Sequence, residues 1–137
     1  MEVLVVDDQE GVRSLLELVV KDEGHQVYTA RNGLEAISIV QSKQPDLIFM
    51  DVRMPLVDGL GALGKIKAIS PGTDVIMMTA FGSEETISEA LEKGALFCLA
   101  KPFDVDTIRK ILARYGAKCR KLYGLPACAY AFKPTHS

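Results

Sequence analysis

The sequence alternates between short apolar runs and longer segments in which apolar residues recur every three or four positions. In the segment after the first run, Val12, Leu15, Leu16, Val19 and Val20 have the spacing of an amphipathic helix. The runs have the length and β-branched content of buried strands: Val3–Val6, Val27–Ala30, Leu47–Met50, Val75–Met78 and Leu96–Leu99. Apolar strands separated by helices are typical of a parallel sheet covered on both faces. We therefore predict an α/β fold, a doubly wound five-stranded parallel sheet with five helices.

Residues with positional preferences mark the predicted helix ends. Ser83 and Asp104 stand where N-caps are expected, and Asp58 with Gly59 opens the third helix. Gly24 and Gly94 stand just after the last apolar position of a helix, where a left-handed backbone conformation is common. The helices therefore have defined ends.

Composition narrows the class of protein. The chain has 137 residues, 48% of them hydrophobic, which suits one domain with a real core. A net charge of −2 gives no indication of a nucleic-acid partner or a membrane. The N-terminus leads straight into a short strand-like run, so we expect neither a leader nor a membrane span. The cysteines are widely spaced without a CxxC pair, which favours free thiols in the cytoplasm.

Polar residues follow four of the predicted strands. They are Asp7, Asp8, Asp51, Thr79 and Lys101. Because the carboxyl ends of parallel strands meet at one edge of the sheet, we expect these side chains to share a pocket. Three carboxylates beside one ammonium repel one another, and Mg²⁺ with its preference for oxygen ligands would relieve that repulsion. The alternative, unrelated solvated loop residues, is disfavoured because all five suit one kind of site.

The segments around these residues resemble the motifs of bacterial response-regulator receivers. They are Val5–Gln9, Met50–Gly59, Met78–Ala80 and Lys101–Phe103. The resemblance covers residues 2 to about 114, with the motifs in the order and spacing of the family. It implies a flavodoxin-like strand order of 2-1-3-4-5. It also divides the chain into a receiver domain, residues 1–115, and a C-terminal tail, residues 116–137, expected to extend the last helix and then to be flexible.

The resemblance also implies a role for each pocket residue. Asp51 is the phosphoacceptor, and Thr79 and Lys101 contact the phosphoryl oxygens. The implied Mg²⁺ site consists of Asp7, Asp8, Asp51 and the backbone carbonyl of Arg53, with Asp7 acting through a water. The peptide bond before Pro102 is expected to be cis, which would aim Lys101 into the pocket.

Within the family, the chain is most similar to single-domain receivers of the sporulation phosphorelay type. The segments that carry this similarity are Asp7–Gln9, Gly11, Arg13, Leu15–Leu16, Gly94–Leu96 and Ala100–Asp104. Such a receiver takes its phosphoryl group from a sensor histidine kinase, can pass it to a histidine phosphotransferase, and is a signalling protein rather than a turnover enzyme. The alternative is a receiver fragment of a nitrogen-regulation type transcription regulator that lacks its output domain.

The resemblance further implies a partner-binding surface. It comprises Gln9, Gly11, Val12, Leu15, Pro102 and Phe103. The apolar band of the first helix is wider than one buried face needs, so part of it should be exposed for a partner helix. Scattered surface apolarity is the alternative.

Three further positions bear on signalling. Cys98 occupies the place where most receivers carry an aromatic switch residue, and Phe97 points to the other face of the strand. Loss of the switch would suit a relay, although a small core residue without regulatory meaning is equally consistent. The resemblance also implies that Arg53 and Phe81 occupy the positions that shield the acyl phosphate from water, so we expect slow hydrolysis.

Two other functions on the same fold are disfavoured. A phosphatase with an aspartate nucleophile needs a carboxylic acid two residues after the nucleophile, where this chain has Arg53. A flavin site needs hydroxyls and backbone N–H groups after the first strand, where this chain has carboxylates.

Overall fold

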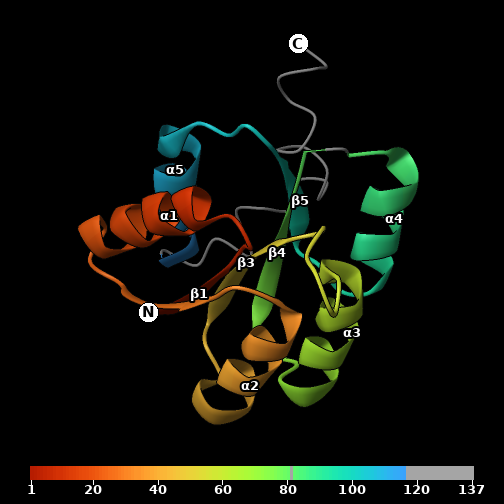
Figure 1. The fold of residues 1–137 in the computed structure, drawn as a ribbon. Coiled ribbons are helices and arrows are strands. Elements are labelled where there is room, and N and C mark those ends of the chain that lie inside the picture. The colour runs from red at the N-terminus through yellow and green to blue at the C-terminus, as the bar shows by residue number, and fades with distance from the viewer. Residues whose placement is uncertain (81, 117–137) are drawn as a thin grey trace.

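The computed structural model describes residues 1–80 and 82–116, and its strands form one parallel sheet (Figure 1). The strands are β1 (Glu2–Val6), β2 (Gln26–Ala30), β3 (Leu47–Asp51), β4 (Asp74–Thr79) and β5 (Phe97–Ala100). Their order is β2-β1-β3-β4-β5, as predicted. Each strand differs from its predicted range by one residue at one or both ends. Strands β1, β2 and β4 begin one residue earlier, β3 and β4 end one residue later, and β5 begins and ends one residue later.

The helices cover both faces of this sheet. They are α1 (Glu10–Asp22), α2 (Gly33–Lys43), α3 (Gly59–Ile69), α4 (Glu84–Glu92) and α5 (Val105–Gly116). Helices α1 and α5 lie on one face, and α2, α3 and α4 lie on the other (Figure 1). The doubly wound architecture predicted from the sequence is thereby confirmed.

Strand β3 shows why the apolar runs become strands. Leu47 and Phe49 pack in the core beneath α1 and α5, whereas Ile48 and Met50 pack in the core beneath α2, α3 and α4. All four are 0% exposed. A fully buried side chain of this size contributes roughly 1.5–3 kcal/mol of hydrophobic stabilisation, which favours apolar residues at the four positions that lie between the two helix layers. The edge strand β2 differs, since it is mostly half-buried or exposed.

The predicted helix ends are also observed. The Ser83 side chain accepts the backbone N–H of Thr86 at 3.1 Å, and Asp104 accepts a first-turn N–H of α5 at 3.0 Å. Gly24 and Gly94 have φ angles of 87° and 105°, which side chains with a Cβ rarely adopt. These ends fix where each chain segment re-enters the sheet.

The end of α5 is attached to the edge of the sheet opposite the predicted site. The Tyr115 hydroxyl donates to the Asp74 carboxylate and, at 3.3 Å, to the Asp46 carbonyl. Of the predicted tail, residues 116–137, Gly116 is the last residue of α5, and residues 117–137 lie outside the described residues, as does Phe81. Within the described part of the chain, no helix combines the length and apolarity that crossing a membrane requires.

Candidate functional site

Four strand ends bring the predicted site residues to one edge of the sheet. Asp7 directly follows β1, Asp51 ends β3, Thr79 ends β4, and Lys101 directly follows β5. The register aligns them, because Asp51 lies opposite Met78 and the next residue of β4 is Thr79. The edge is therefore a product of parallel pairing and not of proximity along the chain.

Three carboxylates meet there. One oxygen each from Asp7, Asp8 and Asp51 lies within 4.8 Å of the other two. Asp7 is 0% exposed and Asp51 is 7% exposed, whereas Asp8 is open to solvent. The site is thus an acidic pocket, closed at the sheet and open on the side of Asp8.

Asp7 is held by bonds to each of its polar groups. Its backbone N–H donates to the carbonyl of Ala30 at 3.2 Å, and its carbonyl accepts from the Arg13 guanidinium at 2.8 Å. Its Oδ1 accepts the backbone N–H of Gln9 at 2.9 Å, and its Oδ2 accepts from Lys101 Nζ at 2.7 Å. Such saturation is what allows a carboxylate to be buried without a large desolvation penalty.

Lys101 is the cation of the pocket. Its Nζ lies 2.7 Å from Asp7 Oδ2 and 3.5 Å from Asp51 Oδ1, and its side chain is 13% exposed. The peptide bond between Lys101 and Pro102 is cis. One ammonium faces three carboxylates, so the pocket keeps an excess of negative charge among the described residues.

The excess of negative charge in the pocket affects the pKa of Asp51. Burial raises the pKa of its carboxyl above the ordinary value, and the charges of Asp7 and Asp8 raise it further, while Lys101 opposes both effects. A bound cation would stabilise the ionised form. Since the three clustered ligand groups are carboxylates, the chemistry of the pocket suits Mg²⁺.

The spacing of the carboxylates also fits a metal site. One oxygen of each lies within 4.8 Å of the other two, so the cluster could hold Mg²⁺ directly or through a bound water.

The backbone around Asp51 depends on a close approach that sequence reasoning missed. Gly59 donates its N–H to the Val52 carbonyl at 2.7 Å, and a Cβ built on Gly59 would lie 2.2 Å from the Asp51 carbonyl oxygen. The sequence marked Gly59 only as a helix opener. The motif around Pro55, Asp58 and Gly59 was the available signal, but it does not show which backbone the glycine faces.

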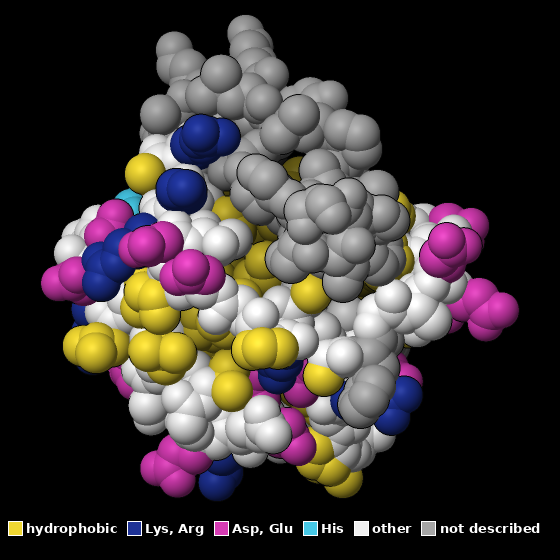
Figure 2. Space-filling view, turned by 90° about the horizontal axis from the view of Figure 1, so that it is seen from above, with side chains coloured by type: hydrophobic (Ala, Val, Ile, Leu, Met, Phe, Trp, Pro, Cys, Tyr) yellow, Lys and Arg dark blue, Asp and Glu magenta, His cyan; other side chains and the backbone are white. Residues whose placement is uncertain are grey.

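A groove borders the acidic pocket. It has a volume of about 370 Å³, and its lining consists of Gln9, Val12, Leu15, Ala80, Lys101, Pro102 and Phe103. The structure thus brings together five of the six residues predicted for partner binding, while Gly11 lies exposed on the first turn of α1 outside the groove. Leu15 and Leu18 of α1 are 41% and 66% exposed. Figure 2 shows hydrophobic side chains gathered on the side of the molecule where α1 lies.

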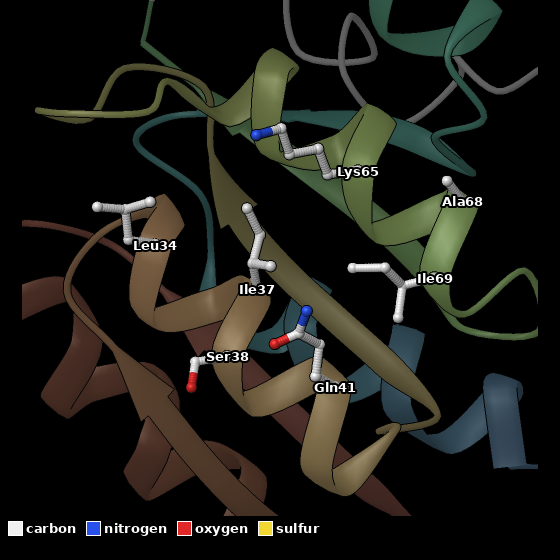
Figure 3. A pocket seen from close by; sticks show the side chains of 7 residues that line it. All are labelled: Leu34, Ile37, Ser38, Gln41, Lys65, Ala68 and Ile69. Carbon is white, nitrogen blue, oxygen red and sulfur yellow. The ribbon is translucent and has the colours of Figure 1, made fainter.

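A second groove lies between α2 and α3 (Figure 3). It measures about 410 Å³ and is lined by Leu34, Ile37, Ser38, Gln41, Lys65, Ala68 and Ile69. Its lining holds one charged side chain and no carboxylate. It therefore lacks the groups for phosphoryl or metal chemistry, and the acidic edge is the candidate site.

Cys98 faces away from α1 and α5. It is 0% exposed in the core beneath α2, α3 and α4, whereas Phe97 packs in the opposite core. The expectation that the two neighbours point to opposite faces is confirmed. Position 98, the predicted switch position, thus has a small and fully buried side chain.

The five-stranded parallel sheet and the carboxylate cluster at its edge together define a receiver-type domain. A family model described as "Response regulator receiver domain" matches residues 3–113. The chain belongs to this family, and so to the proteins of two-component signalling.

Curated relatives fall into two groups. Sporulation initiation phosphotransferase F of Bacillus subtilis is 45% identical over 114 residues, which cover 83% of this chain and 92% of that protein. Transcriptional regulatory protein ZraR of Salmonella typhimurium is 39% identical over 121 residues, which cover 88% of this chain but only 27% of that protein. The chain therefore matches nearly all of the first protein and one part of the second.

Solved structures show the same fold. A CheY-like receiver domain from Methanospirillum hungatei has a TM-score of 0.82 at 23% identity, covering 88% of this chain and 96% of that one. CheY in a CheX-CheY-BeF3-Mg complex from Borrelia burgdorferi has a TM-score of 0.79 at 28% identity, covering 85% and 89%.

Proposed function

We propose that this chain is a single-domain phosphorelay receiver that accepts a phosphoryl group on Asp51 in a Mg²⁺-dependent reaction. The observation that carries the proposal is the acidic pocket, in which the Asp51 carboxylate shares an opening with Asp7 and Asp8 and lies 3.5 Å from Lys101 Nζ. Family membership supports it, and the Borrelia relative is named as a complex with Mg and BeF3. A cytoplasmic location stays a prediction.

Four groups of this chain would hold the metal. Asp8, Asp51 and the backbone carbonyl of Arg53 would bind Mg²⁺ directly, and Asp7 would do so through a water. When bound, Mg²⁺ supplies positive charge that offsets the charge on the phosphoryl oxygens. Asp7 is already bonded to Lys101 and to the Gln9 N–H, which suits it to an indirect role.

Asp51, Lys101 and Thr79 would have separate roles in phosphoryl transfer. An Asp51 carboxylate oxygen attacks the phosphorus of a phosphohistidine on the kinase, forming a P–O bond while the P–N bond breaks and its electron pair returns to the imidazole. Lys101 neutralises one phosphoryl oxygen from its place beside Asp51. The Thr79 hydroxyl, at the neighbouring strand end, donates to another. Positioning and charge neutralisation are the main sources of acceleration in such reactions.

The chain would be a signalling phosphoprotein rather than a turnover enzyme. It catalyses its own phosphorylation and a slow dephosphorylation. Slow hydrolysis is supported by Arg53, an exposed, bulky side chain two residues after Asp51. The second shielding position, Phe81, lies outside the described residues.

The relay assignment rests on the curated relatives. The chain spans 92% of a phosphotransferase and 27% of a transcription regulator. A sensor histidine kinase would be the donor, and a histidine phosphotransferase the acceptor. The alternative, a receiver fragment of a transcription regulator without its output domain, keeps the same pocket chemistry and differs only in where the signal goes after Asp51 is phosphorylated.

Intact-protein mass after incubation with acetyl phosphate tests the pocket chemistry. With Mg²⁺ we expect one added phosphoryl group per chain, and with EDTA we expect none, because three carboxylates would then repel the incoming anion. Equal labelling with and without Mg²⁺ would contradict the proposed metal requirement. Loss of the label within seconds would contradict slow hydrolysis.

The groove beside the pocket is where a partner helix would dock. Leu15 lines this groove, whereas Leu18, on the same helix and more exposed, does not. We expect Leu15→Ala to slow transfer from a histidine kinase that labels the wild type by roughly tenfold, the effect of losing about 1.4 kcal/mol of contact. Leu18→Ala should transfer at the wild-type rate. Labelling of both variants by acetyl phosphate should be unchanged, and equal effects of the two variants on kinase transfer would exclude the groove as the docking site.

A further inference from the structure

Asp8 is the carboxylate of the acidic pocket with the least support from its surroundings. Lys101 contacts Asp7 and Asp51, at 2.7 Å and 3.5 Å, and Asp7 also accepts a backbone N–H. Among residues 1–80 and 82–116, no group donates a hydrogen bond to the Asp8 carboxylate, which is exposed to solvent. Its position is therefore set by the backbone from which it extends.

Arg13 holds that backbone. Its Nη1 donates to the carbonyl oxygen of Asp7 at 2.8 Å. This carbonyl and the N–H of Asp8 belong to one planar peptide unit, so a bond to the oxygen also fixes the orientation of the Asp8 N–Cα bond. On the other side, the Asp7 N–H is bonded to Ala30 at 3.2 Å. The guanidinium of Arg13, on α1, thus fixes the peptide unit between Asp7 and Asp8.

The anchor of Arg13 is itself rigid. Arg13 lies in the first turn of α1, where its backbone N–H donates to the Gln9 carbonyl at 3.1 Å. Three residues further on, Leu16 is fully buried in the core beneath α1 and α5. The guanidinium therefore transmits the position of a packed helix to the loop between β1 and α1.

We propose that Arg13 is a positioning residue for the metal site, which sets the orientation of Asp8 for Mg²⁺ binding. The inference rests on the proposed function, because it assumes that Asp8 is a metal ligand. Mg²⁺ demands near-octahedral ligand geometry, so a ligand free to turn binds it less well than a fixed one.

The direction in which Mg²⁺ affinity changes when Arg13 is removed distinguishes a positioning role from an effect of its charge. Arg13 is a cation close to a cation site, so its charge alone opposes Mg²⁺ binding, and removing that charge alone would tighten binding. If Arg13 acts by holding the Asp7–Asp8 peptide, removing it weakens binding instead.

The test is the Mg²⁺ dissociation constant from isothermal titration calorimetry for the wild-type chain and for Arg13→Met. Methionine keeps an aliphatic stem and removes the donor, and thermal melting in EDTA verifies that the variant is folded. We expect Arg13→Met to bind Mg²⁺ roughly tenfold more weakly, as is typical when a group that orients a metal ligand is lost. Arg31→Met is the matched control, because Arg31 bonds Glu35 at 3.1 Å instead of the pocket backbone. It should bind no more weakly than the wild type.

A double-mutant cycle with Asp8→Asn shows whether Arg13 acts through Asp8. In the Asp8→Asn background, Arg13→Met should change the dissociation constant less than about twofold, since the group that Arg13 orients is no longer a charged ligand.

Two outcomes would overturn the inference. One is Mg²⁺ binding by Arg13→Met that is unchanged or tighter, and the other is equal weakening with and without Asp8. Failure of the proposed function looks different: a wild-type chain that binds Mg²⁺ yet takes no phosphoryl group from acetyl phosphate would refute the phosphoacceptor assignment and leave the Arg13 measurement intact.

Discussion

Asp51→Asn should abolish phosphorylation and, in the same variant, stabilise the metal-free protein. An amide cannot form the acyl phosphate, so intact-protein mass after incubation with acetyl phosphate and Mg²⁺ should show no addition. The same change removes a buried negative charge that faces Asp7 and Asp8 within 4.8 Å. In EDTA at neutral pH, we expect the free energy of unfolding to rise by on the order of 1 kcal/mol, a usual size for a single-site effect.

The pH dependence of this gain has a definite sign. The pKa of Asp51 is raised in the folded protein, chiefly by burial, so the folded state holds this proton more tightly than the unfolded state. The contribution of Asp51 to stability is fully present below its unfolded pKa and is lost as the pH rises through the raised folded pKa. In urea titrations without metal, the gap between Asp51→Asn and the wild type should therefore be largest at neutral pH. It should narrow as the pH falls toward about 4, the ordinary carboxyl range.

Mg²⁺ should reverse the order of the two proteins. Binding to the folded wild type adds stability that grows with metal concentration, whereas Asp51→Asn lacks one charged ligand and should gain less. A phosphoryl group on Asp51→Asn would locate the acceptor elsewhere, with Asp8 the nearest exposed carboxylate. A variant less stable than the wild type in EDTA would contradict the electrostatic account of the pocket.

Gly59→Ala should destabilise the protein by more than about 3 kcal/mol, in the range of severe backbone clashes. The added Cβ would lie 2.2 Å from the Asp51 carbonyl oxygen and 2.8 Å from the Val52 Cα. Both contacts are with backbone atoms, so neither can be relieved by a side-chain rotation. Equilibrium unfolding in urea, followed by far-UV circular dichroism, measures the loss. Any protein that still folds should also be phosphorylated more slowly, because the clash displaces the backbone of Asp51, the phosphoacceptor.

Gly64→Ala is the matched control in the same helix. Gly64 is exposed in the middle of α3, and apart from its chain neighbours and the nearby backbone of its own helix, a Cβ there would meet no atom within 4 Å. Alanine in a helix interior is favoured over glycine by about 1 kcal/mol, so this variant should be more stable than the wild type. If both variants changed stability in the same direction by similar amounts, the close approach at Gly59 would not be what excludes a side chain.

The alternation of apolar runs with helical periodicity was enough to predict the fold, because each strand must be apolar where helices cover both of its faces. Strand β3 meets that condition from Leu47 to Met50, and the caps at Ser83 and Asp104 marked helix starts that the structure confirms. Strand boundaries moved by one residue, because backbone pairing extends beyond the apolar runs to polar residues such as Gln26, Asp51 and Asp74.

The same local reasoning placed Asp7, Asp8, Asp51, Thr79 and Lys101 at strand ends, and parallel pairing is what turns those ends into one pocket. What only the tertiary structure decided is how the pocket is held. The bond from Arg13 to the Asp7 carbonyl and the contact of Gly59 with the Asp51 backbone join groups whose spacing in the sequence carries no periodic signal. The sequence pattern predicts on which face of a helix or strand a side chain lies, because the face depends only on the period of that helix or strand. Contacts with the backbone of another segment depend on how whole elements pack, and for Arg13 and Gly59 that packing became visible only in three dimensions.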